Sequence, residues 1–562
     1  MSEVDIDKKM VEIKDQELEA NAKQKAQSGN LPYLNLRFFP VDAGTLFLVD
    51  EPTARQAGIA VIAKTGTVLT IAAQDPFIPP VEAIVQGLTK KGFVIHFTIV
   101  SAHSLATAWE RYKYKKQERK SSYGVLHVDQ QAIEQFEAQI QNIKDLKEHI
   151  TSLPITQVLN VLIAGALKIG ASDIHFEPEE HEVRLRYRLD GVLTDIVAFS
   201  SSGYPEILSR VKLDSGLKIN VHAAPQDGRF TIRLPALRTG GSANPHGGKD
   251  KDIEVRVSIL PGAYGENIVM RLLDPSSIRQ KLEDLGMRED TLALIKNLLK
   301  KNTGSILTTG PTGSGKTTTL YAFLQYINTP DVKIITIEDP IEYHIEGISQ
   351  TQVNDQAGYS FVEGLRSIVR QDPDVILVGE IRDQETAEIT MQAALTGHLV
   401  LSTIHTNNAA GTIPRLIDLG VRPVTIAPAI NAAMAQRLVR RLCKVCKKKT
   451  PVKHEDYELL KRYLEHLPPT VTGVPEIGES MQIYDPVGCT ACNTSGYKGR
   501  IGVYEIFEID AEMQKLILTS PALADVQELA VKKGLTTILQ DALIKAAQGI
   551  TSIDEVMRVV GE

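Results

Sequence analysis

Residues 310–317 form the pattern G-x-x-x-x-G-K-T, the spacing of a loop that binds polyphosphate. A glycine-rich turn lets backbone N–H groups approach phosphate oxygens closely, Lys316 supplies a positive charge for the β- and γ-phosphates, and the Thr317 hydroxyl can ligate Mg²⁺. The helical stretch TTLYAFLQYI follows, so the positive end of a helix should meet the phosphates. We predict an ATP and Mg²⁺ site at Gly310, Pro311, Thr312, Gly313, Ser314, Gly315, Lys316 and Thr317.

Acidic residues follow two apolar stretches that we expect to be strands of one sheet. Glu380 ends the stretch DVILVGE, a position from which a carboxylate near such a loop holds Mg²⁺ through water. Glu338, Asp339 and Glu342 follow the stretch IITI. Any of these three acids can orient or deprotonate a water that attacks the γ-phosphate. The alternative for both groups is an ordinary solvated acid at the end of a strand.

Two histidines, His398 and His405, bracket the apolar stretch LVLSTI. A single histidine in such a place is more often structural. Two histidines that frame a core strand of a phosphate-binding domain favour a role beside the γ-phosphate, in sensing it and placing the attacking water.

All four cysteines form two C-x-x-C pairs, Cys443 with Cys446 and Cys489 with Cys492. Two such pairs provide four thiolates for one tetrahedral zinc ion. The 42 residues between the pairs, 447–488, are more than a compact zinc ribbon contains, so a small insertion should fold between them. A redox C-x-x-C or four independent buried thiols are the alternatives.

The composition excludes several classes of protein. With 562 residues, 43% hydrophobic and 23% charged, the chain is long enough for three or four globular domains. The net charge of −7 does not suggest nucleic acid as the main partner. Neither a signal peptide nor an apolar stretch of membrane-spanning length is found, so we expect a cytoplasmic protein that contacts membranes only through partners.

Changes of pattern along the chain predict its domains. Short apolar runs alternate with turn signals from Pro32 to about Tyr112, and alternating strand patterns follow in the next part of the chain. From Gly286 on, strands alternate with helices as in a mostly parallel sheet. The segment TGGSANPHGGKDKD should be a flexible loop. The expected parts are a flexible tail at 1–30, a small α/β domain at 31–112, a linker and helix at 113–150, an α+β domain at 151–275, and an α/β domain at 286–562 with a cysteine insertion at 440–500.

Together these motifs resemble those of the bacterial type II secretion and type IV pilus extension ATPases. GPTGSGKTTTLY resembles the family's Walker A motif, IITIEDPIEY its Asp box, DPDVILVGEIRD its Walker B motif and TGHLVLSTIHTN its His box. ASDIHFEP, PQDGR and RVSILPGAYGENIVMRLL resemble its second N-terminal domain. The resemblance implies a RecA-like ATPase domain with a zinc-knuckle insertion, preceded by a PAS-like domain and a docking domain.

The resemblance also implies roles for individual residues. Glu342 would be the catalytic carboxylate, and Glu380 would help to hold Mg²⁺. His398 and His405 would line the γ-phosphate. Arg256 and Arg271 would move onto the nucleotide. Three further arginines match family positions near the nucleotide or the subunit interface: Arg366, Arg370 and Arg382.

The implied function is a homo-hexameric ATPase that drives assembly of pilus or pseudopilus subunits on an inner-membrane platform protein. The N-terminal extension and the cysteine pairs favour extension or secretion over retraction. Some members bind cyclic di-GMP through an R-x-G-x-x-L type pattern, which this chain lacks, so we predict no such site. The alternatives are a DNA-uptake or conjugation motor and a nucleotide-gated scaffold without turnover.

Overall fold

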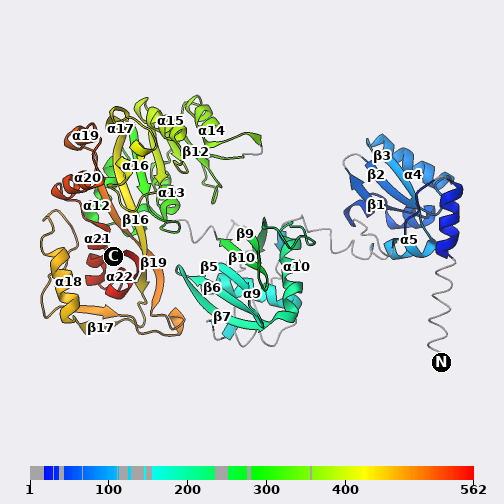
Figure 1. Cartoon of the computed structure of the whole chain (residues 1–562), viewed down its shortest axis with the longest axis horizontal. Coiled ribbons are helices and arrows are strands. Elements are labelled where there is room, and N and C mark those ends of the chain that lie inside the picture. Colours follow the sequence, from blue (N-terminus) through cyan, green and yellow to red (C-terminus); the bar gives the residue numbers. More distant parts are fainter. Residues whose placement is uncertain are drawn as a thin grey trace, which may run out of the picture. The chain divides into compact units, whose positions relative to one another are not determined.

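The structure is a computed structural model of the whole chain, shown in Figure 1. It describes residues 18–29, 31–36, 43–65, 68–109, 112, 125–127, 143, 145–146, 155–234, 251–274, 280–354 and 357–561. Contacts divide the chain into two units, residues 1–122 and 123–562. Most of the expected linker at 113–150 and residues 239–250 of the expected glycine-rich loop lie outside the described residues.

The first unit is the predicted small α/β domain. Its three-stranded sheet has the order β1-β2-β3, with β1 antiparallel and β3 parallel to the central strand. The strands span Ile59–Thr65, Val68–Ala73 and Val94–Ile99, and the helices are α2 (Ala43–Leu46), α3 (Glu51–Ala57), α4 (Pro79–Lys90) and α5 (Ala102–Trp109). β1 and β2 are almost entirely apolar in sequence, which explains their burial in the core of this unit.

The expected flexible tail at 1–30 needs correction for its second half. Residues 18–28 form a helix, and its Ala22 and Ala26 are buried against Ile99 at the end of β3. Glu19 on the same helix accepts hydrogen bonds from Tyr33 and Ser101. Two alanines four residues apart are too weak a pattern to predict an amphipathic helix from the sequence. Their small side chains let the helix approach the sheet closely.

The second unit begins with a seven-stranded sheet of order β4-β8-β9-β10-β5-β6-β7. These strands span Val125–His127, Gln226–Leu234, Lys251–Gly262, Gly265–Leu273, Ala171–Pro178, Glu182–Leu189 and Val192–Ser200, and the helices are α9 (Ile155–Ile169) and α10 (Tyr204–Asp214). Strand β4 and the fully buried Leu146 belong to this α+β domain. The domain therefore starts before residue 151, within the segment expected to be a linker and helix.

The next domain is the predicted α/β domain with a parallel-rich sheet of order β13-β12-β14-β15-β11-β16-β19. All neighbours pair in parallel except β16 and β19. The four core strands expected from the sequence are present as β11 (Gly304–Thr309), β12 (Ile334–Glu338), β14 (Val375–Val378) and β15 (Leu399–Ile404), and the others are β13 (Ser349–Gln352), β16 (Ile430–Leu442) and β19 (Tyr497–Glu508). The four core strands are buried at every position, as continuous apolar runs predict.

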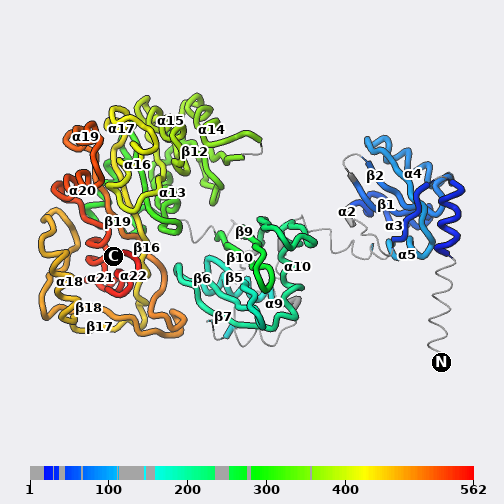
Figure 2. The backbone as a smooth tube through the Cα atoms, viewed as in Figure 1, coloured from blue at the N-terminus to red at the C-terminus, as the bar shows by residue number. Residues whose placement is uncertain are grey.

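Helices cover both faces of this sheet, and the cysteine insertion packs on the C-terminal ones (Figure 2). Between the cysteine pairs lie β17 (Lys448–Pro451), α18 (His454–Leu464) and β18 (Gln482–Asp485), which confirms that a small insertion folds there. The remaining helices are α12 (Glu289–Leu298), α13 (Lys316–Ile327), α14 (Phe361–Val369), α15 (Gln384–Leu395), α16 (Thr412–Asp418), α17 (Pro423–Ala429), α19 (Ala511–Ile517), α20 (Leu523–Lys532), α21 (Ile538–Ala547) and α22 (Ile553–Val560).

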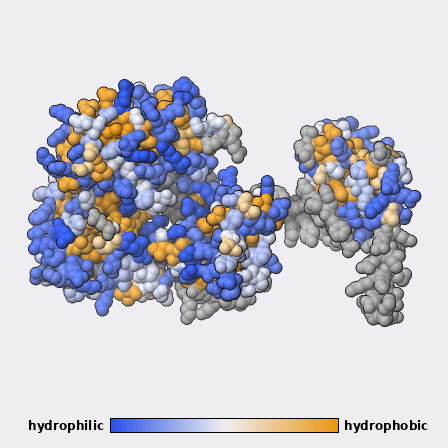
Figure 3. All heavy atoms as spheres, viewed as in Figure 1, coloured by the Kyte–Doolittle hydropathy of each residue, from blue (hydrophilic) through white to orange (hydrophobic). Residues whose placement is uncertain are grey.

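Hydrophilic residues are spread over the face of both units drawn in Figure 3. Among the described helices, none has both the length and the apolar character needed to span a bilayer.

Candidate nucleotide-binding site

The loop between β11 and α13 has a shape that only glycine allows at two positions. Gly310 has a φ of +146° and Gly315 a φ of +89°. A Cβ on Gly310 would lie 2.6 Å from the carbonyl oxygen of Gln436, and one on Gly315 would lie 2.8 Å from the Gln436 side-chain nitrogen. Strand β16 therefore supports this phosphate-binding loop directly from behind.

Lys316 begins α13 and folds back into the loop. Its Nζ donates to the carbonyl oxygens of Gly310, at 2.7 Å, and Pro311, at 3.2 Å. Burial lowers the pKa of Lys316, the Glu380 carboxylate opposes that shift, and Arg437 adds to it. The ammonium group thus lies at the centre of the loop, where phosphate oxygens can replace these carbonyls as partners.

A cavity of about 450 Å³ opens in front of the loop. It collects residues from five strands of this sheet, β12, β14, β15, β16 and the antiparallel β19, and from the preceding α+β domain. The carboxyl ends of the parallel strands meet at this edge of the sheet. Its lining brings together most of the residues predicted from the sequence: Thr312, Gly313, Ser314, Gly315, Lys316, Thr317, Glu338, Asp339, Glu342, Glu380, His405 and Arg271.

Glu380 follows β14 and is held by the side chains of Arg382 and His405. Its carboxylate pairs with Arg382 and accepts a 3.1 Å hydrogen bond from His405. Burial by itself would raise the pKa of Glu380, but the hydrogen bonds from Arg382 and His405 outweigh it and lower the pKa. Glu380 therefore offers an ionised carboxylate beside the loop, and such a group suits a Mg²⁺ site.

The three acids after β12 have different surroundings. The acidic loop (residues 339–348) joins β12 to β13 and carries two of them. Glu338 is buried, whereas Asp339 is exposed. The Glu342 side chain is one-third exposed and pairs with Arg256 across 2.9 Å. Glu342 and Asp339 can therefore meet a water molecule in the cavity, whereas Glu338 lines the cavity but is only 4% exposed.

The structure does not bring the two histidines together within one chain. His405 follows the carboxyl end of β15 and lines the cavity. His398 precedes the amino end of the same strand, and its Nδ1 lies 2.9 Å from the carbonyl oxygen of Ala393. A six-residue strand spans about 20 Å, which is too far for both histidines to reach one phosphate loop. Only His405 reaches the loop of its own subunit. The geometry of a single chain therefore does not support the predicted role of His398 beside the γ-phosphate.

Two predicted arginines lie on neighbouring strands of the α+β domain. Arg256 on β9 is the register partner of Arg271 on β10. Arg256 donates to the Glu342 carboxylate and, at 2.8 Å, to the carbonyl oxygen of Ile341. Arg271 donates to Asp173 at 2.9 Å, lines the cavity and is 56% exposed. Arg366 instead pairs with Glu363 and Glu385 outside the cavity, and Arg370 donates to Ser367.

Sequence reasoning missed two further arginines at this site. Arg500 on β19 lines the cavity. Arg437 on β16 lies behind Gly310 and donates to the carbonyl oxygen of Asn407, just after His405. Both lie more than a hundred residues beyond the phosphate loop in sequence, and no local pattern marks them, because only the order of strands in the sheet brings β16 and β19 to the loop.

The four cysteines form one compact cluster. Their sulfur atoms all lie within 4.8 Å of one another, and three pairs are 3.7 to 3.9 Å apart. A tetrahedral zinc ion with Zn–S distances of about 2.3 Å separates its sulfur ligands by roughly 3.8 Å. The backbone N–H groups of Cys489 and Gly496 also point at the Cys492 sulfur. The cluster, which follows β16 and precedes β19, fits a structural zinc ion.

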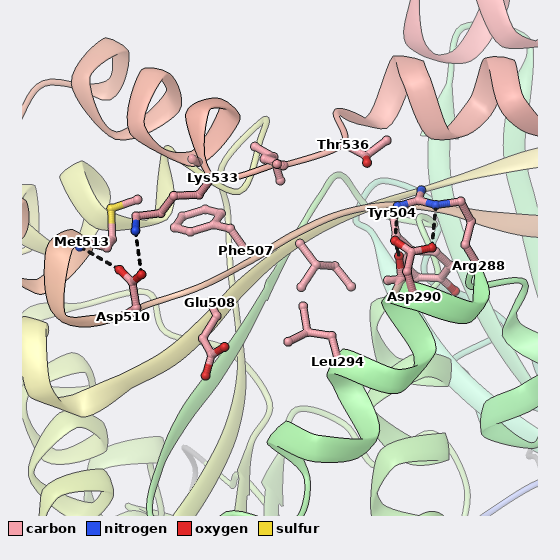
Figure 4. Close-up of a pocket in the computed structure, with 15 residues that line it drawn as sticks. Arg288, Asp290, Leu294, Tyr504, Phe507, Glu508, Asp510, Met513, Lys533 and Thr536 are labelled. Carbon is pink, nitrogen blue, oxygen red and sulfur yellow. Dashed lines mark hydrogen bonds and ion pairs between the residues drawn. The ribbon is translucent and has the colours of Figure 1, made fainter. Parts of the chain in front are cut away.

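A second cavity, of about 400 Å³, lies between α12, β19 and the turn after α20 (Figure 4). Its charged groups are paired: Arg288 with Asp290 on one side and Lys533 with Asp510 on the other. Behind Arg288, the carboxylate of Asp541 bonds Arg288 at 2.5 Å, the Lys545 ammonium, and the backbone N–H of Tyr504 at 2.8 Å. This network, which lies away from the phosphate loop, ties the start of the domain to its C-terminal helices.

Replacing Asp541 by asparagine is expected to destabilise this domain by about 3–5 kcal/mol, because two buried cations lose their shared counter-charge. Asp541 is 1% exposed, against 7% for Arg288 and 3% for Lys545. Urea unfolding followed by circular dichroism measures the change. Asp510→Asn is the matched control. Asp510 is 46% exposed and caps α19, a role that asparagine keeps, so a loss below about 1 kcal/mol is expected. Equal losses for the two variants would contradict the prediction.

The fold and the site define a P-loop nucleotide-binding protein with a preceding α+β domain that contributes arginines. Residues 148–558 match the family described as type II/IV secretion system protein, and the chain belongs to this family. Residues 29–119 match the MshEN domain.

Similar proteins include assembly and secretion ATPases. The chain is 36% identical over 529 residues to the type IV pilus assembly ATPase PilB of Myxococcus xanthus, covering 94% of this chain and 88% of that protein. It is 43% identical over 419 residues to the type II secretion system ATPase E of Vibrio cholerae, covering 75% and 78%. The ATPase DotB of Yersinia pseudotuberculosis has the same fold, with a TM-score of 0.51 and 20% identity over 72% of this chain and 95% of that one.

The MshEN match bears on the expected absence of a cyclic di-GMP site. This domain is of a type that binds cyclic di-GMP, whereas the sequence pattern for that ligand is missing here. The absence therefore stays a prediction for this chain.

Proposed function

We propose that this protein hydrolyses ATP with Mg²⁺ and uses the energy to drive assembly of type IV pilus or type II secretion pseudopilus subunits, as a homo-hexamer. The observation that carries the proposal is the cavity at the phosphate loop, which unites a lysine, several acidic residues, a histidine and an arginine of the α+β domain. Two similar proteins, the pilus assembly ATPase and the secretion ATPase described above, support the same function.

Each residue has a chemical part in this proposal. Backbone N–H groups of the loop and Lys316 would hold the β- and γ-phosphates. Thr317 and Glu380 would hold Mg²⁺, which would supply positive charge beside the phosphate oxygens. Glu342 orients the attacking water and takes its proton, with Asp339 beside it. His405 keeps Glu380 in place through its hydrogen bond. Arg256 and Arg271 meet the transferring phosphate when the α+β domain closes.

A place for the nucleoside adjoins the phosphate cavity. A further hollow of about 470 Å³ shares Arg271, Gly315 and Leu438 with it and extends along Leu273 and Thr318 to Tyr504. Apolar walls next to a phosphate loop suit a purine ring. We propose that adenine enters this hollow.

The partner in this proposal is an inner-membrane platform protein, with the chain in the cytoplasm and attached to the membrane only through that partner. A DNA-uptake or conjugation motor is less favoured, because the net charge is −7 and the two relatives described above act in pilus assembly and secretion. Direct binding of nucleic acid is not part of the proposal.

Steady-state phosphate release by the full chain, with and without the cytoplasmic part of a candidate platform protein, tests the proposal. We expect Mg²⁺-dependent ATP turnover that rises when the platform fragment is added. Binding of ATP without any turnover, in both conditions and in hexameric preparations, would favour the nucleotide-gated scaffold instead. Stimulation by DNA and not by the platform would favour the DNA motor.

We propose zinc as the metal of the cysteine cluster. Metal analysis of protein purified under reducing conditions without chelator should find about one zinc per chain. Chelation should increase proteolysis within 440–500 while binding of an ATP analogue persists, because the metal closes the insertion and the phosphate loop keeps its own supports. Less than about a tenth of an equivalent of zinc would count against the site.

A further inference from the structure

Tyr321 occupies the space between the phosphate loop and the acidic loop. It lies in the second turn of α13, the helix that Lys316 begins, and its side chain is fully buried. Its ring packs edge-on against Tyr343, with centroids 4.6 Å apart and planes inclined at 70°. Tyr343 directly follows Glu342, so this ring contact joins the phosphate-binding helix to the segment that carries the proposed catalytic acid.

The Tyr321 hydroxyl makes three polar contacts there. It donates to the Glu338 carboxylate, and it accepts from the Glu342 backbone N–H and from the Gln350 side-chain amide, each at 3.4 Å. Burial, reinforced by the charge of Glu338, raises the pKa of Tyr321, so the hydroxyl remains a donor at any physiological pH. One oxygen atom thus connects α13, the end of β12 and the main chain of Glu342.

Glu338 serves as the fixed acceptor that orients this hydroxyl. Besides Tyr321, its carboxylate accepts from Thr336 Oγ1 at 2.5 Å and from Gln350 Nε2 at 3.2 Å. The side chain is 4% exposed. A carboxylate held by three donors and covered by protein is poorly placed to take a proton from water, and well placed to hold a neighbouring hydroxyl in one direction.

Gln350 on β13 extends the same network to the far side of the acidic loop. Its amide nitrogen also donates to the Tyr343 carbonyl oxygen at 3.1 Å, and its oxygen accepts from the Ile345 backbone N–H at 2.8 Å. The loop is therefore tied at Glu342, Tyr343 and Ile345 to groups that are buried or belong to the sheet.

We propose that Tyr321 is a positioning residue for ATP hydrolysis, which holds the main chain of Glu342 at a set distance from the phosphate loop through its hydroxyl. The inference rests on the proposed function, in which Glu342 is the catalytic acid. Its physical basis is that hydrolysis depends steeply on placement: a 1 Å displacement of a reacting group costs on the order of 10²-fold in rate. Glu338 is then the anchor of Tyr321.

Tyr321→Phe in the full chain removes one oxygen and keeps the ring and its contact with Tyr343. We expect turnover to fall about 10-fold or more, while the KM for ATP and the affinity for an ATP analogue stay within about threefold. Tyr359→Phe is the matched control: its hydroxyl bonds Thr351 on the same strand as Gln350, and the residue does not line the nucleotide cavity. The control should keep the wild-type rate, and equal losses for the two variants would overturn the proposal.

A double-mutant cycle with Glu342→Gln separates positioning from general support, with single-turnover ATP cleavage as the readout. If Tyr321 acts through Glu342, adding Tyr321→Phe to Glu342→Gln should cost less than about twofold further. The same 10-fold loss in both backgrounds would overturn the inference. Near-wild-type turnover of Glu342→Gln alone would instead remove the proposed catalytic role of Glu342, a separate failure.

Glu338→Gln supplies a second, independent check, because the amide oxygen still accepts from the Tyr321 hydroxyl. Its turnover should fall less far than that of Glu342→Gln. A loss as large as that of Glu342→Gln would make Glu338 the catalytic acid and would overturn its part as an anchor.

Discussion

Replacing Glu342 by glutamine is expected to lower ATP turnover about 10²–10⁴-fold and to leave nucleotide binding intact. Glutamine keeps the size of the side chain and a hydrogen-bond acceptor, but it cannot take a proton from water. Glu342 lines the phosphate cavity with its side chain one-third exposed, so a water molecule can reach it. Parallel measurements of phosphate release and of binding of a fluorescent ATP analogue give the two quantities.

Two further variants serve as a reference for complete loss of activity and as a control. Lys316→Ala should abolish hydrolysis and weaken binding with the fold intact, because the β- and γ-phosphates lose the cation at the centre of the loop. Glu346→Gln, an exposed acid of the same acidic loop that does not line the cavity, should keep the wild-type rate. Near-wild-type turnover of Glu342→Gln would move the catalytic role to Asp339 or Glu338.

Replacing Arg271 by alanine is expected to reduce turnover by on the order of 10²-fold while ATP affinity changes only a few-fold. Contacts that form only in the hydrolysis-competent state lower the barrier more than they tighten binding. In this structure Arg271 lines the cavity from β10 but bonds Asp173, so its proposed role requires it to leave Asp173 and move onto the phosphate. Arg256 is held by Glu342, and Arg256→Ala should give a similar pattern.

A matched control for the arginines lies on the same sheet. The Arg184 side chain on β6 is 41% exposed and pairs with Asp195, and it does not line the cavity, so Arg184→Ala should leave turnover unchanged. Initial rates over a range of ATP concentrations separate affinity from turnover. If Arg271→Ala raises the KM about 100-fold at an unchanged maximal rate, the arginine contributes to ground-state binding and the closing of the α+β domain is not required for hydrolysis.

The amino-acid sequence was sufficient wherever function depends on local pattern. The spacing of Gly310, Gly315 and Lys316 specifies a phosphate loop because the turn, the cation and the helix start are contiguous. Each C-x-x-C pair is also a local pattern, and two such pairs predict one cluster of four thiols. Unbroken apolar runs predict the core strands of the parallel sheet. The phosphate loop and the core strands are each complete within a short stretch of chain, whereas the two cysteine pairs lie 42 residues apart and the fold brings them together.

Only the tertiary structure decided which distant residues meet. His398 and His405 lie at opposite ends of strand β15. Of these two histidines, only His405 lies at the end that lines the cavity. Arg437 and Arg500 reach the site because β16 lies beside β11 in the sheet and β19 lies beside β16.

The acids after β12 show the same division between sequence and structure. The sequence does not distinguish the carboxylates of Glu338, Asp339 and Glu342. In the structure, burial and the hydrogen bond from Tyr321 set Glu338 apart from the two more accessible acids. Strand order and burial arise from packing of the whole domain, and no local stretch of sequence contains that information.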